Sequence, residues 1–157
     1  MASRDQEFEL AFAELYALAW RAAMRILGEP AAAEDVAAET LTRAYVRWPR
    51  MATFAAAWVV RTATNLAIDG WRRQGRRPLA PRVASGDPAA AAAASVDLAV
   101  GLRALPRRQR EAVVLRHLND LPEAAVAAAM GCSTGAVKQH TARGLAALRS
   151  ALGDDEE

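Results

Sequence analysis

Near the carboxyl end of the chain, a serine and the polar residues that follow it have the types and spacing of a helix that reads DNA. Ser133 can cap a new helix, which would carry Lys138 on its leading turns. Gly131 stands where a preceding helix must stop and the chain must reverse, a left-handed position that glycine adopts without a Cβ clash. In a helix-turn-helix, the leading end of the second helix meets base edges in the major groove. The pattern therefore predicts binding to double-stranded DNA.

A second group of residues has the chemistry needed for single-stranded nucleic acid. Arginine and asparagine residues recur at helical spacing and form one stripe of a helix, and Trp58 lies beside this stripe. Bases stack on aromatic rings, guanidinium groups hold phosphates, and asparagine pairs with a base edge. The alternative is that Asn65 is a structural residue with its hydrogen bonds made inside the protein, and that all four tryptophans lie in the core. We expect Trp20, Trp48 and Trp71 to be core residues, and both interpretations remain open for Trp58. The stripe comprises Arg61, Asn65, Asp69, Arg72 and Arg76.

A third group lies on an earlier helix and is mostly acidic. Glu34, Asp35 and Glu39 project away from its apolar stripe, and Glu39 forms an i, i+4 pair with Arg43. Without further context, such a face is most simply a solvated helix surface, since exposed ion pairs contribute only about 0–1 kcal/mol. A docking surface for a protein partner is the other interpretation.

Other classes of chemistry find little support. No paired carboxylates, nucleophile–base spacing or glycine-rich phosphate loop appear, which argues against an enzyme. No metal or cofactor is indicated, because His117 and His140 belong to separate elements and Cys132 is most simply a small apolar residue. The single cysteine excludes an internal disulfide, and no apolar run reaches about 18 residues. We therefore expect a cytoplasmic protein without a membrane span.

Charge is distributed unevenly, although the net charge is only +2. Residues 1–40 contain eight acids and three bases, whereas residues 41–82 contain nine arginines and one aspartate. A second basic block, residues 98–153, has eight bases and three acids, and the tail 154–157 is entirely acidic. Two basic blocks separated by a spacer imply two surfaces for a polyanion. The acidic first block implies a different partner.

Apolar periodicity predicts an all-α protein of two small helical domains joined by a flexible linker, the second domain being the helix-turn-helix. Gly28 and Pro30 end a first helix, Pro49 closes a second that starts near residue 31, and a third covers about residues 54–73. Prolines and glycines in residues 75–95 break any helix entering them, although the alanine run at the far end is able to begin one. The expected domains are residues 1–74 and 96–153, with linker 75–95 and acidic tail 154–157.

These segments together resemble the sigma factors of bacterial RNA polymerase, in particular the extracytoplasmic-function (ECF) group of the sigma-70 family. The resemblance rests on AAEDVAAETLTRAYVRW at residues 32–48, AAWVVRTATNLAIDGWRRQGR at residues 56–76, and LPRRQREAVVLRHL with AAAMGCSTGAVKQHTARGLAALR within residues 105–149. Their order and separation are those of the family, whose members consist of two helical domains and a linker.

The resemblance implies a role for each group. The acidic helix would dock on the β′ clamp helices of core RNA polymerase, the middle helix would capture the non-template strand of the minus-ten element, and the second domain would read the minus-thirty-five duplex and touch the β flap. Members of the family commonly have an anti-sigma partner. Implied for polymerase are Glu34, Asp35, Glu39 and Arg43; for minus-ten DNA Trp58, Arg61, Asn65, Asp69, Arg72, Arg73 and Arg76; and for minus-thirty-five DNA Ser133, Thr134, Lys138, Gln139, His140 and Arg143, with Arg107, Arg108 and Arg110 near phosphate.

Several positions depart from the family pattern. Ala38 stands where many relatives carry glutamine in the clamp-binding helix, and Gln139 and His140 replace a commoner Ser-Arg pair, which implies a different promoter sequence. Pro122 stands where a capping serine is common, so Asp120 and Glu123 are expected to form a shifted capping box. A stand-alone helix-turn-helix regulator that binds an operator as a dimer explains the second domain equally well. That hypothesis does not explain the stripe that contains Asn65 or the acidic face of the earlier helix.

Overall fold

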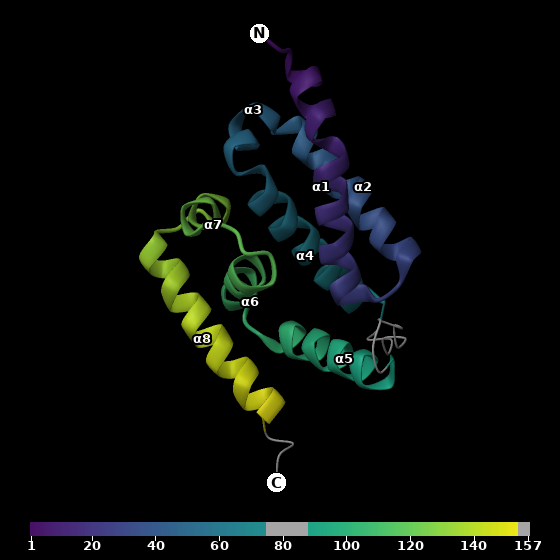
Figure 1. The fold of residues 1–157 in the computed structure, drawn as a ribbon, viewed down its shortest axis with the longest axis vertical. Helices are drawn as coiled ribbons and strands as arrows, with labels where there is room; N and C mark the ends of the chain where they lie inside the picture. Colours follow the sequence, from purple (N-terminus) through teal and green to yellow (C-terminus); the bar gives the residue numbers. More distant parts are fainter. Residues whose placement is uncertain (75–87, 154–157) are drawn as a thin grey trace.

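The computed structural model describes residues 1–74 and 88–153, and these are helical, without a strand. An N-terminal unit, α1–α4, is followed by a C-terminal unit, α5–α8 (Figure 1). The predicted site residue Arg76, linker residues 75–87 and tail 154–157 lie outside the described residues. The elements are α1 (Arg4–Leu27), α2 (Pro30–Val46), α3 (Trp48–Met51), the 3-10 turn η1 (Ala52–Phe54), α4 (Ala55–Arg73), α5 (Pro88–Ala104), α6 (Arg107–Val113), the π-helical turn η2 (Val114–Leu118), α7 (Glu123–Met130) and α8 (Thr134–Gly153).

The N-terminal unit is built on α1, against which α2 and α4 pack. Ser3 and Gln6 form a capping box at the start of α1, and Gly28 ends it with a positive φ of 68°. The boundary predicted at Pro49 is wrong, because α2 ends at Val46 and Pro49 lies in the first turn of α3, where its missing N–H costs no helical bond. Of the tryptophans expected in the core, Trp48 is buried, whereas Trp20 and Trp71 are half-buried.

The C-terminal unit contains the helix-turn-helix. α7 ends at Gly131 with a φ of 64°, and the Ala136 amide donates to Ser133 Oγ at 3.1 Å, which caps α8 as the sequence predicts. The expected capping box of Asp120 and Glu123 is wrong, because Pro122 occupies the N-cap of α7 and no side chain caps that helix. α5 begins at Pro88, so the last eight residues of the stretch expected to be linker are helical.

The two units are in contact. α7 packs against α4 and η1, η2 packs against α4, and α5 packs against α1; Figure 1 shows α6 and α7 lying beside α4. Buried apolar residues from both units belong to one continuous cluster, which includes Ile26 of α1 and Leu102 of α5. The C-terminal unit therefore covers part of the helix that carries the arginine and asparagine stripe.

Candidate nucleic-acid interface

The leading part of α8 is open to solvent. The side chain of Lys138 is 73% exposed, and its Nζ lies 3.8 Å from Glu123 Oε1, a long and loose ion pair. The neighbouring Val137 is buried and packs α8 against its unit. The remaining predicted duplex contacts on this helix are the exposed Ser133, Thr134, Gln139 and Arg143 and the half-buried His140. This face is thus available for a DNA groove as it stands.

A groove of about 260 Å³ runs along α4 and collects the predicted strand-binding residues. Arg47 lies over the Trp58 ring, 5.9 Å from its centroid, so a cation and an aromatic surface lie side by side there. The groove is lined by Arg43, Arg47, Trp58, Arg61, Thr62, Asn65, Leu66, Asp69 and Arg107. The structure therefore brings together four of the seven predicted residues and adds arginines from α2 and α6.

The predicted backbone-binding arginines Arg72 and Arg73 are exposed at the end of α4. Arg73 lines a separate groove that also includes Asp35 and Glu39 of α2, so its charge lies near the acidic face rather than among the strand-binding residues. The arginines at this end of α4 are accordingly divided between two surfaces.

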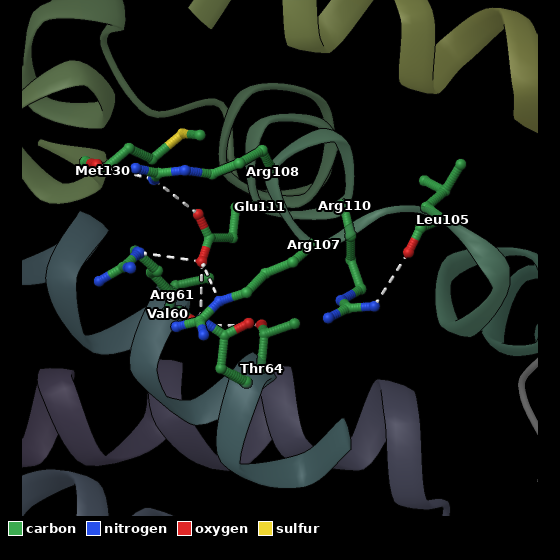
Figure 2. A network of polar contacts seen from close by, with 10 residues as sticks. Val60, Arg61, Thr64, Leu105, Arg107, Arg108, Arg110, Glu111 and Met130 are labelled. Carbon is green, nitrogen blue, oxygen red and sulfur yellow. Dashed lines mark hydrogen bonds and ion pairs between the residues drawn. The ribbon is translucent and has the colours of Figure 1, made fainter. Parts of the chain in front are cut away.

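A buried carboxylate from the other unit reaches the α4 groove. Glu111 of α6 has a fully buried side chain, and Asn65 Nδ2 donates to its Oε1 at 2.8 Å. Arg61 Nε and Arg107 Nε each lie 3.1 Å from the same oxygen, and Arg108 Nη1 lies 3.2 Å from Oε2. Figure 2 shows the carboxylate of Glu111 among three arginines, with Arg61 and Arg107 at one of its oxygens and Arg108 at the other.

The environment of Glu111 keeps it ionised. Burial alone raises its pKa, but the hydrogen bond from Asn65 and the charge of Arg61, with the hydrogen bond from Arg107, outweigh burial and leave the pKa below its ordinary value. The Asn65 amide uses only part of its hydrogen-bonding capacity, because its Oδ1 is buried without a hydrogen-bond partner among the described residues. The amide group thus retains an unused acceptor beside a used donor.

Sequence reasoning did not single out Glu111. Its spacing from Arg107 and Arg108 signals intrahelical ion pairs, and those pairs are present. The contacts with Arg61 and Asn65 depend on the docking of one unit on the other. A lone acid within the basic run RRQRE was the only local signal.

The arginines predicted near phosphate differ in exposure. The side chains of Arg107 and Arg108 are 63% and 44% exposed, and Arg108 also donates to the Met130 carbonyl at 2.7 Å. Arg110 is 3% exposed and donates to the Leu105 carbonyl at 3.2 Å, and burial lowers its pKa. Arg110 therefore does not present its guanidinium to the surface where a phosphate would lie, and we assign it to the interior of the unit.

The acidic face of α2 is exposed as the sequence predicts. Glu39 Oε1 accepts from Arg43 Nε at 2.8 Å, and Glu34 and Asp35 are exposed beside them. A groove of about 230 Å³ lies along this face between α2 and the end of α4. Its lining includes the apolar Leu27, Val36 and Leu66 together with Asp35, Glu39 and Arg73. Apolar side chains beside two carboxylates suit a basic, partly apolar protein helix.

Arg103 makes a second polar contact between the units, away from the α4 groove. Its Nη2 donates to the Ile26 carbonyl, at the end of α1, at 2.7 Å. Its guanidinium lies over the Trp71 ring, 4.1 Å from the centroid. A cation at the carboxyl end of a helix also meets the negative end of the helix dipole.

The described residues contain no group of three or more His, Cys, Asp or Glu side chains arranged to hold a metal ion. None of their helices is both long and apolar enough to cross a membrane.

Comparison with known proteins gives two family matches. The family described as "Sigma-70 region 2" matches residues 11–77, and "Sigma-70, region 4" matches residues 96–148. The first match contains α2 and α4, and the second contains the helix-turn-helix.

Curated relatives extend the similarity over most of the chain. An RNA polymerase sigma-E factor of Streptomyces avermitilis is 33% identical over 138 residues, covering 84% of this chain and 77% of the relative. The ECF RNA polymerase sigma factor SigL of Mycobacterium tuberculosis is 30% identical over 148 residues, covering 87% and 83%. The fold resembles that of the sigma factor RpoE in its complex with the anti-sigma factor NepR from Bartonella quintana, with a TM-score of 0.60, 23% identity, and coverage of 97% and 98%.

Proposed function

The chain belongs to the ECF group of the sigma-70 family of RNA polymerase sigma factors, and from this premise we propose which of its surfaces perform each step of initiation. A member of this family binds core RNA polymerase and directs transcription to promoters. The stand-alone regulator is not favoured, because region 2 and region 4 matches occur in one chain.

The α4 groove is assigned to the separated minus-ten strand. The observation that carries this assignment is the convergence of Trp58, Arg61 and Asn65 on one groove, with arginines of α2 at its edge. The ring offers a stacking surface, the guanidinium groups offer phosphate contacts, and the Asn65 amide, whose donor contacts Glu111 in this structure, has the donor and the acceptor that a base edge needs. Asp69 lines the same groove, and Arg72, Arg73 and Arg76 are assigned to the strand backbone.

The open face of α8 is assigned to the minus-thirty-five duplex. Thr134, Lys138 and Gln139 lie in its first two turns, where a recognition helix meets base edges, and His140 and Arg143 follow. Arg107 and Arg108 are assigned to phosphate. The N-terminal and C-terminal units act as separate domains on DNA, connected in sequence by residues 75–87, so that each reads its own element.

The acidic face of α2 is assigned to core polymerase, at the β′ clamp helices, and the C-terminal unit also touches the β flap. Glu34, Asp35 and Glu39 are exposed beside an apolar groove, which supports docking of a basic helix there. Arg43, paired with Glu39, orients that carboxylate. An anti-sigma protein is a further partner, and it would compete for surfaces that polymerase uses.

The protein works in the cytoplasm, where polymerase and chromosome are, and it supplies recognition rather than chemistry. Phosphodiester bonds are formed by the polymerase. The chain requires no cofactor or metal for the roles assigned here.

The test is reconstitution of transcription with core RNA polymerase. Purified chain added to core enzyme on genomic DNA is expected to produce discrete start sites, which sequencing of the transcripts maps. Failure to initiate at any site would overturn the proposed function.

The polymerase surface is tested by the double charge reversal Asp35→Lys and Glu39→Lys. Charge pairs at interfaces couple by about 1.5–7 kcal/mol, so we expect core binding to fall by roughly 100-fold or more. Charge reversal of Glu14, an exposed carboxylate of α1, is the matched control. Unchanged association of the double variant with core would contradict the assignment of α2.

A further inference from the structure

The first turn of α1 is fastened to the end of α2 at one residue, Tyr45. Arg4 Nη2 donates to the Tyr45 carbonyl, and its guanidinium lies over the Tyr45 ring, 4.4 Å from the centroid. The Tyr45 hydroxyl donates to Asp5 Oδ1 at 2.7 Å. This hydrogen bond raises the pKa of Tyr45, which therefore keeps its hydroxyl proton. All three residues are exposed, so these contacts lie outside the apolar core of the unit.

The contact between Arg4 and the Tyr45 carbonyl caps a helix. The last carbonyls of a helix lack partners within the helix and form the negative end of its dipole. α2 ends one residue after Tyr45, so the Tyr45 carbonyl is one of these acceptors. The Arg47 amide donates to two others, the carbonyls of Arg43 and Ala44, at 3.3 and 3.1 Å. Arg4 therefore supplies a cation from α1 where the end of α2 needs one.

Phe8, one turn further along α1, holds the chain on both sides of Arg47. The Phe8 ring is buried and meets the Tyr45 ring edge-on, with 5.2 Å between centroids. It meets the Trp48 ring in the same way at 5.1 Å, and Trp48 is the buried first residue of α3. Edge-to-face contacts depend on ring orientation as well as distance. Because Arg47 lies between Tyr45 and Trp48 in sequence, its backbone is restrained from α1.

Arg47 is one of the arginines at the edge of the α4 groove. Its guanidinium lies 5.9 Å from the centroid of the Trp58 ring, beside the surface assigned to base stacking. Arg47 and Arg50 of α3 also line a second groove, of about 370 Å³, to which Trp58 and Arg61 contribute. The three α1 residues line neither groove. They therefore act on this region only through the chain that they hold.

We propose that Arg4, Asp5 and Phe8, the α1 brace, position Arg47 for strand capture without touching the strand. The inference rests on the proposed function, because it takes the α4 groove as the strand site. Tyr45 is a positioning residue in this arrangement, since it transmits the hold of α1 to the arginine two residues later. Residues 34–39 of the acidic face lie earlier on α2, so the α1 brace does not act on polymerase binding.

The geometry is tested in the free chain labelled with 5-fluorotryptophan, whose fluorine signals report the surroundings of each indole. Arg4→Ala and Tyr45→Ala are expected to shift the Trp58 signal in the direction in which Arg47→Ala shifts it. Trp71, near the other end of α4, should keep its signal in all three variants. Replacement of each tryptophan in turn by phenylalanine assigns the signals. An unmoved Trp58 signal in both brace variants would overturn the positioning of Arg47.

The role in strand capture is tested by promoter opening in the polymerase holoenzyme. Arg4→Ala and Arg47→Ala should each lower the permanganate reactivity of open complexes by roughly 5-fold, the low end of the value of one stacked base. If Arg4 acts through Arg47, the double variant is no weaker than Arg47→Ala alone, whereas two independent losses multiply to roughly 25-fold. Arg21 is an exposed arginine of α1, and Arg21→Ala is the matched control that should open normally.

Tyr45→Phe keeps the test valid if Arg4→Ala or Tyr45→Ala impairs folding. It removes only the hydroxyl that is bonded to Asp5 and leaves the aromatic ring in place. We expect it to shift the Trp58 signal in the same direction and to lower opening by roughly 2-fold, the scale of one exposed hydrogen bond.

Normal opening by Arg4→Ala, or losses that multiply in the double variant, would overturn the α1 brace as a device for strand capture. Weaker binding of Arg4→Ala to core polymerase would overturn it as well, because a general loss of structure affects both functions. Failure of the proposed function is separate, since it is read from Asn65→Ala. Normal opening by that variant removes the strand site from α4, while the fluorine signals still show whether α1 positions Arg47.

Discussion

The two helices assigned to DNA, α4 and α8, meet their surroundings differently. The reading face of α8 is open, with Lys138 73% exposed, whereas Arg61 on α4 is 23% exposed and is paired with Glu111. A duplex groove is a rigid partner that needs only an accessible helix, so α8 needs no rearrangement. A separated strand offers phosphate charges that an intramolecular carboxylate is able to imitate. With these assignments, α8 is accessible to duplex as it stands, whereas Arg61 and Asn65 of α4 are in contact with Glu111.

The largest effect expected for a single residue of α4 or α8 is on promoter opening, as distinct from initial duplex binding. Asn65→Ala removes the amide assigned to a base edge, and a bidentate asparagine–base pair contributes about 1–3 kcal/mol, so open complexes of the holoenzyme should fall by roughly 10-fold or more. Initial duplex binding should stay unchanged, because α8 is untouched. Permanganate reactivity of unpaired thymines measures opening, and gel shift measures binding. An equal loss at both steps would contradict the division between α4 and α8.

Glycines in the two helices provide the next test. A Cβ on Gly144 of α8 would lie 2.6 Å from Val113 Cγ2 and 3.1 Å from the Gln109 carbonyl oxygen, whereas a Cβ on Gly70 of α4 would meet nothing within 4 Å. Gly144→Ala should lower the free energy of unfolding by about 1–2 kcal/mol, because overpacking exceeds the gain in helix propensity. Gly70→Ala should raise it by about 0.5–1 kcal/mol.

Thermal or urea unfolding measures both glycine variants. The opposite signs follow from the close approach of α8 to α6, which positions the recognition helix. A stabilising Gly144→Ala would mean that α8 does not pack against α6 at the distance described.

A smaller effect on the salt dependence of duplex binding distinguishes an exposed arginine from one that is paired with an acid. Arg143 is exposed on α8, and each phosphate contact contributes about 0.9 to the slope of log affinity against log salt. Arg143→Ala should therefore reduce that slope by about one for duplex binding by the free chain. Arg61→Ala should leave the slope unchanged, because Arg61 is already paired with Glu111. Fluorescence anisotropy at several salt concentrations measures the slope for each variant. Equal slopes for the two variants would contradict the different roles assigned to Arg143 and Arg61.

The sequence predicted the features that local chemistry determines. Gly131 and Ser133 identify the turn because a left-handed residue and a capping hydroxyl are set by neighbouring backbone, and the structure confirms both. It did not predict that Asn65 meets Glu111, since 46 residues separate them and only the docking of two units brings them together. The burial of Arg110 was not predicted for the same reason, because the local run RRQRE does not reveal the neighbours that bury it.

The smallest expected effect concerns two acid–base pairs with the same i, i+4 spacing in the two units. Glu39 and Arg43 on α2 are about half exposed, at 52% and 47%, whereas Glu111 beside Arg107 is fully buried. Glu39→Gln should change the free energy of unfolding by less than about 1 kcal/mol, because water screens an exposed pair. Glu111→Gln should cost more, since it removes the buried carboxylate that balances the charges of Arg61, Arg107 and Arg108. Urea unfolding compares the two variants, and equal costs would mean that Glu111 is as well solvated as Glu39, in which case it does not hold the two units together.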